Sequence, residues 1–77
     1  MELKWLEDFV ALAEAGSFSR SARERNVTQP AFSRRIRALE HWLGVVLVDR
    51  STYPMSLTAA GHRFYETARQ VVALLHN

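Results

Sequence analysis

The 77-residue chain is long enough for one domain with a modest hydrophobic core. It has no cysteine, no histidine spacing typical of zinc sites and no apolar run that could span a bilayer, so disulfides, a metal site and a membrane location are not expected. The net charge is only +2, yet residues 17–37 hold six arginines against Glu24 alone, whereas residues 1–16 have a balance of −3.

The first two predicted helices lie within residues 3–25. An amphipathic helix is expected to end near Gly16, with Trp5 and Leu12 beside its main apolar stripe, and that stripe comprises Leu3, Leu6, Phe9, Val10 and Ala13. Ser17 is a good N-cap for a short second helix, which should bury Phe18 and Ala22 and end near Arg25. Asn26 is predicted to end it in the left-handed conformation.

A third helix is predicted from about residue 28 to residue 43. Thr28 caps it, Pro30 is tolerated in its first turn, and Gly44 ends it. Its buried face is expected to comprise Phe32, Ile36, Leu39 and Leu43, and Trp42 is also expected in the core. The segments Val45–Val48 and Met55–Leu57 predict a small hairpin, or wing, and Thr58 should cap a last helix that runs to the end of the chain.

Two short helices joined by a tight turn predict a helix-turn-helix over about residues 18–37. The third helix presents a polar face made of Gln29, Pro30, Ser33, Arg34 and Arg37. A major groove can admit such a helix, and these groups can bind base edges or phosphates there. Residues 25–39 contain no carboxylate that would repel DNA. We expect Arg35 to point to solvent or phosphate, and at least one of Arg20, Arg23 and Arg25 to contact phosphate.

Two other functions remain as alternatives. A helical protein–protein interaction module would need apolar anchors on the exposed face of the third helix, where the sequence has polar and charged residues instead. An enzyme is not expected, because no serine or cysteine pairs with a histidine in a recognisable motif and there is no glycine loop for phosphate.

The sequence resembles the N-terminal DNA-binding domain of the LysR family of bacterial transcription regulators. The resemblance covers nearly the whole chain and is most specific in the run Thr28-Gln29-Pro30-Ala31-Phe32-Ser33, continued by Ile36, Leu39-Glu40, Leu43-Gly44, Arg50, Leu57-Thr58 and Ala60-Gly61. Lys4-Trp5-Leu6 and the stretch 29–40 look like the hypochlorite-responsive branch of that family. The resemblance implies a mainly α fold: a winged helix-turn-helix (a three-helix core with a two-stranded wing) over residues 1–58, and a linker helix over residues 59–77.

The same resemblance implies how such a domain would bind a partly palindromic operator in double-stranded DNA. The third helix would lie in the major groove and the wing in the minor groove. Residues expected at the DNA are Thr28, Gln29, Pro30, Ser33, Arg34, Arg37, Arg20, Arg23, Arg50, Thr52 and Tyr53. The chain departs from the family where Val48 replaces a usual phenylalanine, and where Tyr53 replaces a frequent wing-tip arginine or lysine.

The last helix is expected to pair with a second copy. Its apolar stripe comprises Phe64, Ala68, Val71, Val72 and Leu75; the part near Phe64 can pack on the first helix, and the part from Ala68 onward extends beyond what so small a core can cover. The resemblance likewise implies a homodimer through this helix, and a small-molecule effector only for a C-terminal domain that this chain lacks. No cofactor is expected, and the expected location is the bacterial cytoplasm, at the nucleoid.

Overall fold

The computed structural model describes residues 1–76. Four helices and a two-stranded antiparallel ribbon follow one another along the chain as α1 (Leu3–Ala15), α2 (Phe18–Glu24), α3 (Gln29–Leu43), β1 (Val48–Asp49), β2 (Ser56–Leu57) and α4 (Ala59–Leu75). The expected mainly α architecture with a small wing is confirmed. The last helix, predicted to run to the end of the chain, ends at Leu75 with His76 as its C-cap, and residue 77 lies outside the described residues. No helix within residues 1–76 is long and apolar enough to cross a membrane.

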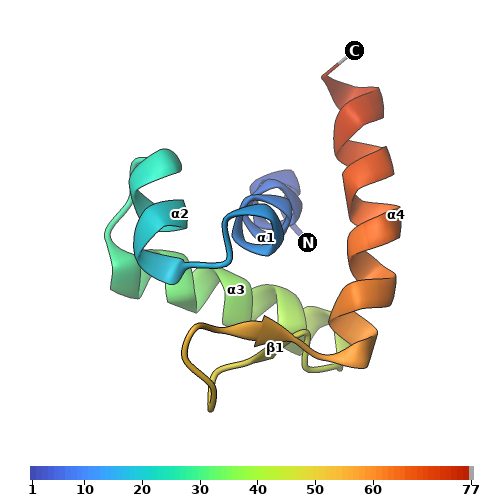
Figure 1. Cartoon of the computed structure of the whole chain (residues 1–77). Coiled ribbons are helices and arrows are strands. Elements are labelled where there is room, and N and C mark those ends of the chain that lie inside the picture. Colours follow the sequence, from blue (N-terminus) through green and yellow to red (C-terminus); the bar gives the residue numbers. More distant parts are fainter. Residues whose placement is uncertain (77) are drawn as a thin grey trace.

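Helix α1 lies in the middle of the molecule, seen nearly end-on in Figure 1, with α2 on one side, α4 on the other and α3 below. Its buried apolar face is formed by Leu6, Phe9 and Leu12. The sequence had placed Leu12 at the side of the stripe and Leu3 within it, but Leu3 is exposed. The face is rotated because α1 packs against α2 and α3 as well as α4.

Local capping sets most helix ends where the sequence predicted them. The side-chain oxygens of Ser17, Thr28 and Thr58 accept the backbone N–H three residues ahead, at 3.1, 3.3 and 3.0 Å. Gly44 closes α3 at φ 74°, and Asn26 follows α2 at φ 59°, both in the left-handed region. These short-range contacts confirm the predicted helix boundaries to within a residue or two.

The wing is shorter than the sequence predicted, and its first strand begins later. Val45 and Val46 are exposed and unpaired with β2; the register joins Val48 to Leu57 and Asp49 to Ser56. The preceding backbone is engaged elsewhere, since the Thr58 hydroxyl donates to the carbonyl of Val46 at 2.7 Å. Trp42, expected in the core, is 59% exposed because Leu43 takes the core-facing position in the last turn of α3.

Two contacts fix the segment between α3 and α4. A carboxylate oxygen of Glu40 accepts the backbone N–H of Leu47 at 2.8 Å and that of Val48 at 3.1 Å. Gly61, in the first turn of α4, lies against the carbonyl of Leu47, where any Cβ would collide. The Glu40 side chain of α3 and Gly61 of α4 therefore fix the position of the base of the wing.

We expect Glu40→Ala to destabilise the protein by about 2–6 kcal/mol, because two backbone N–H groups near the core lose their acceptor and each such loss costs about 1–3 kcal/mol. Urea denaturation measures the effect. Glu66→Ala is the matched control: this carboxylate lies in an exposed pair with Arg69, and its loss should cost less than about 1 kcal/mol. Equal losses for the two variants would contradict this account of Glu40.

Candidate nucleic-acid interface

The helix-turn-helix is formed by α2, a four-residue turn and α3. Val27 enters the turn with its N–H bonded to the carbonyl of Ala22 at 3.0 Å, and its side chain packs on the core. The face of α3 that points away from the core then presents Thr28, Gln29, Pro30, Arg34 and Arg37, all exposed. The first half of α3 is thus a protruding polar surface, which is the form that a groove-binding helix needs.

Ser33 lies on this surface but is only partly exposed, because Arg50 covers it. The Arg50 guanidinium donates to the Ser33 hydroxyl and, at 3.4 Å, to its carbonyl. The same guanidinium stacks on Phe18, with its central carbon 4.6 Å from the ring centroid. Burial lowers the pKa of Arg50, and the nearby charge of Arg37 lowers it further. The positively charged side chain of Arg50 therefore holds the wing against Phe18 of α2 and Ser33 of α3.

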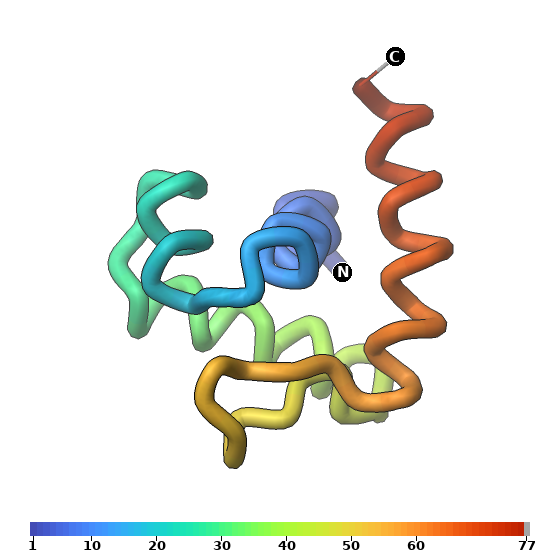
Figure 2. Tube along the Cα trace, in the orientation of Figure 1, coloured from blue at the N-terminus to red at the C-terminus, as the bar shows by residue number. Residues whose placement is uncertain are grey.

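The tip of the wing has a different character. Thr52, Tyr53 and Pro54 are exposed, Tyr53 completely so, and none is charged. Between the wing and the start of α2 and α3 lies a groove of about 550 Å³, whose lining includes Ser17, Gln29 and Arg50. The hairpin projects below the helices in Figure 2, so the groove is bounded on one side by a protruding tip.

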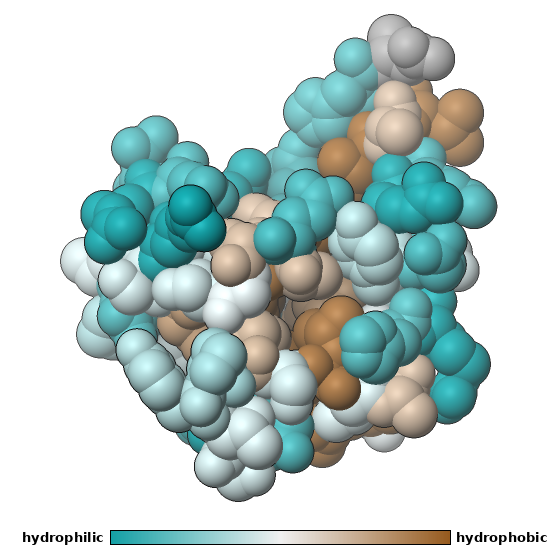
Figure 3. Space-filling view, viewed as in Figure 1, coloured by the Kyte–Doolittle hydropathy of each residue, from teal (hydrophilic) through white to brown (hydrophobic). Residues whose placement is uncertain are grey.

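The arginines of the basic segment fall into two groups. Arg20, Arg23, Arg34 and Arg37 are exposed, with no carboxylate within 4 Å in the described residues, and Arg23 donates to Ser19 at 3.2 Å. Strongly hydrophilic residues gather at the upper left of Figure 3, where Figure 1 places α2. These four cations are free to bind an anionic partner.

Arg25 and Arg35 behave differently from the expectation. Both donate to Asp8 of α1, whose side chain is fully buried, and hydrogen bonding to Asp8 raises the pKa of Arg35. The prediction that Arg35 faces solvent or phosphate is wrong, and Arg25 is likewise paired inside the domain. Sequence reasoning missed Asp8, although a carboxylate directly beside Phe9 and one turn before Leu12 on a buried helix face was a signal that a cation must meet it.

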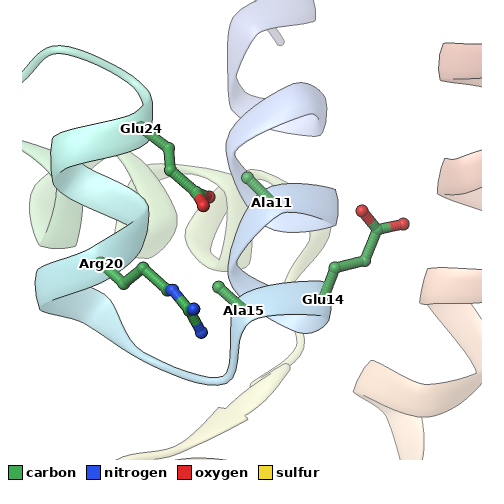
Figure 4. Close-up of a pocket in the computed structure, with 5 residues that line it drawn as sticks. All are labelled: Ala11, Glu14, Ala15, Arg20 and Glu24. Atoms are coloured by element: carbon green, nitrogen blue, oxygen red, sulfur yellow. The ribbon is translucent and has the colours of Figure 1, made fainter.

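A shallow hollow between α1 and α2 offers no comparable surface. Figure 4 shows Arg20 and Glu24 of α2 directed towards Ala11 and Ala15 of α1, while Glu14 points away towards α4. Its two carboxylates oppose the one guanidinium, which disfavours an anion. Within residues 1–76 no group of three potential metal ligands comes together.

The apolar stripe of α4 divides between the core and solvent. The ring of Phe64 packs at a tilt against that of Phe9 with centroids 5.5 Å apart, Ala68 is buried, and Val72 packs on the core. The exposed part was expected to start at Ala68, but Ala68 touches the chain's own core because α1 reaches further along α4 than the sequence suggested. The exposed apolar residues are Val71, Leu74 and Leu75, at the projecting end of α4 (Figure 3).

Comparison with known proteins gives this surface a context. Residues 3–62 match the family model described as bacterial regulatory helix-turn-helix protein, lysR family. The chain is 47% identical over 74 residues to the HTH-type transcriptional regulator TcbR of Pseudomonas sp. strain P51, covering 96% of this chain and 25% of that protein. It therefore spans about a quarter of the relative's length.

Two solved structures are similar over 99% of this chain. DarR of Vibrio fischeri, in complex with DNA, has a TM-score of 0.94 and 54% identity, with 26% of DarR covered. HypT of Salmonella typhimurium, a hypochlorite-specific LysR-type transcriptional regulator, has a TM-score of 0.90 and 47% identity, with 26% of HypT covered. The identity to HypT equals that to TcbR, so sequence identity does not distinguish the hypochlorite-responsive branch from other members of the family.

Proposed function

The chain belongs to the LysR family of bacterial regulatory helix-turn-helix proteins, and on that premise we propose that it binds double-stranded DNA sequence-specifically as the DNA-binding part of a transcription regulator. The observation that carries the proposal is the protruding, carboxylate-free face of α3, flanked by unpaired arginines and the wing. In this proposal residues 1–58 are the DNA-binding unit, residues 59–77 are a linker helix, and the DNA is that of the bacterial cytoplasm.

On α3, we assign Gln29 and Pro30 to base edges in the major groove, and Thr28, Arg34 and Arg37 to phosphates or bases. Gln29 supports this role because an exposed amide at the start of the helix can donate and accept at one base, as adenine requires. Ser33 accepts from Arg50, which leaves its own O–H free to donate to DNA. Ser33 thus joins the wing to the recognition surface.

Around α3, we assign Arg20 and Arg23 to phosphates, since the first helix of such a pair crosses the DNA backbone. The wing would approach the DNA through Thr52 and Tyr53. With Arg50 held back against Ser33 and Phe18, the tip offers hydroxyl groups and an aromatic ring in place of a cation. We therefore propose that the wing contacts sugar and phosphate rather than selecting A·T pairs electrostatically.

The binding proposal is tested by titrating a fluorescent duplex at several salt concentrations. If the four exposed arginines of α2 and α3 each neutralise one phosphate, the logarithm of the affinity should fall against the logarithm of salt concentration with a slope of about −3.6. Absence of binding at low salt would contradict the proposal and favour a protein–protein interaction module. A flat salt response would exclude the arginine contacts.

Mutations should distinguish the residues that bind base edges from those that bind phosphates. Gln29→Ala should lower the ratio of operator to scrambled-DNA affinity, with a cost of about 1–3 kcal/mol for a base contact, whereas Arg23→Ala should weaken both complexes alike and make the salt slope shallower by about 1. The operator is first obtained by selecting bound sequences from a random duplex pool. An unchanged ratio for Gln29→Ala would mean that α3 is oriented differently.

We further propose a homodimer formed through the exposed end of α4, with the two recognition helices about 34 Å apart in successive major grooves. Leu75→Asp should shift sedimentation equilibrium towards folded monomers and weaken operator binding, because a carboxylate would enter an apolar contact of Val71, Leu74 and Leu75. Gln70→Asp is the matched control: it adds the same charge to α4 at an exposed polar position. Dimerisation that survives Leu75→Asp would place the interface elsewhere.

A further inference from the structure

Asp8 is the one acidic residue among those described whose side chain is completely buried. It accepts three hydrogen bonds from two guanidiniums: Oδ1 from Arg25 Nε at 2.8 Å and from Arg35 Nη2 at 2.7 Å, and Oδ2 from Arg35 Nε at 2.6 Å. An isolated buried carboxylate would be strongly unfavourable, and these charge-assisted bonds are what make the position tenable.

The two arginines come from the two helices of the helix-turn-helix. Arg25 is the C-cap residue of α2, where the turn begins, and Arg35 lies near the middle of α3. Arg35 binds both carboxylate oxygens, so its orientation as well as its distance is fixed. One carboxylate on α1 therefore fixes the positions of α2 and α3 relative to each other.

We propose that Asp8 is a positioning residue for DNA recognition, which sets the tilt of α3 through its bonds to Arg25 and Arg35; this inference rests on the proposed DNA-binding function. Residue 29 is six residues from Arg35, or about 9 Å along the helix. A tilt of about 10° at Arg35 would move Gln29 by about 1.6 Å, which exceeds what a hydrogen bond to a base tolerates.

The ion pairs of Asp8 and Glu7 with Arg25 and Arg35 also determine which arginines are available to DNA. Arg25 and Arg35 have side-chain exposures of only 28% and 22%, and Arg25 bonds Glu7 as well, at 3.3 Å. Their charges are matched by Asp8 and Glu7 inside the domain, so they add little to non-specific attraction for phosphate. Asp8 should therefore act on sequence discrimination, because the loss of its charge removes no phosphate contact and can only add to the attraction for phosphate.

The test compares Asp8→Asn with the wild-type chain in binding to the selected operator and to scrambled duplex, at a temperature where circular dichroism shows both proteins folded. The expected result is a fall of about tenfold in the operator-to-scrambled ratio, equivalent to one lost base contact, with a salt slope no shallower than that of the wild-type chain, since no phosphate-binding arginine is lost. Phe64→Leu is the matched control, since it weakens the core between α1 and α4. On a duplex with a single half-site, where the spacing between two copies of the chain plays no part, its ratio should stay at the wild-type value.

A second variant distinguishes a loss of helix positioning from a simple loss of stability. In Asp8→Asn the guanidinium of Arg35 loses its charged partner, and adding Arg35→Gln restores a neutral pair that can still hydrogen bond. The double variant should regain part of the discrimination, which a purely destabilising effect would not do. If Asp8→Asn fails to fold, Arg35→Gln alone, at a partly exposed residue, should show the loss of discrimination.

The outcomes separate this inference from the proposed function. A wild-type chain that binds operator DNA while Asp8→Asn and Arg35→Gln keep its discrimination overturns the role of Asp8 only. A wild-type chain that binds no duplex overturns the DNA-binding function. In that case the amide chemical shifts of Asp8→Asn still test the geometry: changes that extend from the neighbourhood of residue 8 into α2 and α3 support the positioning role of Asp8, and changes that stay within α1 or spread evenly over the domain refute it.

Discussion

Phe9 and Leu12 lie on one face of α1 with no exposed surface, where α2, α3 and α4 meet. A chain of this size has few side chains with which to build a core, so one central helix has to serve every neighbour. Phe9 meets Phe64 of α4, and Phe18 packs edge-on to Phe32 where α2 meets α3, with centroids 6.1 Å apart. The recognition surface and the linker helix are both supported by α1, although α1 itself presents none of the residues assigned to DNA.

The electrostatic arrangement follows from this packing. The acidic N-terminal segment and the arginine-rich middle of the sequence meet in space, and α1 takes two arginines out of the basic surface through Asp8 and Glu7. Hydrogen bonds from His76 and Arg25 lower the pKa of Glu7, which keeps this carboxylate ionised as the pH falls. Of the six arginines in residues 17–37, the four that stay exposed lie on α2 and on one side of α3, so this part of the positive charge is concentrated around the protruding helix.

Features that depend on a few neighbouring residues could be predicted from the sequence, and those that depend on distant partners could not. The caps at Ser17, Thr28 and Thr58 are local contacts, and the sequence located all three. Asp8, which accepts from Arg35, is 27 residues away, and Glu40, which accepts from the backbone N–H of Leu47, is 7 residues away. The residues next to Arg35 and Leu47 do not indicate which side chain will be the acceptor. A β-branched run at 45–48 predicted a longer strand, but capping of α4 and the Glu40 carboxylate engage that backbone instead. In the candidate site, helical periodicity was enough to predict the exposed face of α3. It could not predict that Arg50 covers Ser33, because the two residues are 17 positions apart and meet only in the folded chain.

The contacts of α4 with α1 have a consequence for the dimer proposed above. Besides the Phe9–Phe64 pair, the Tyr65 hydroxyl donates to Glu14 at 2.9 Å, and His76 Nε2 lies 2.6 Å from a carboxylate oxygen of Glu7. These contacts are made by residues about two turns apart on α1, Glu7 and Glu14, so they fix the direction of α4 as well as its distance. If two chains pair through the projecting end of α4, that direction determines how far apart the two α3 helices lie. Asp8 fixes α3 on the same helix α1 that holds α4. The spacing of the half-sites would then be set by α1, which lies between the dimer contact and the DNA surface and belongs to neither.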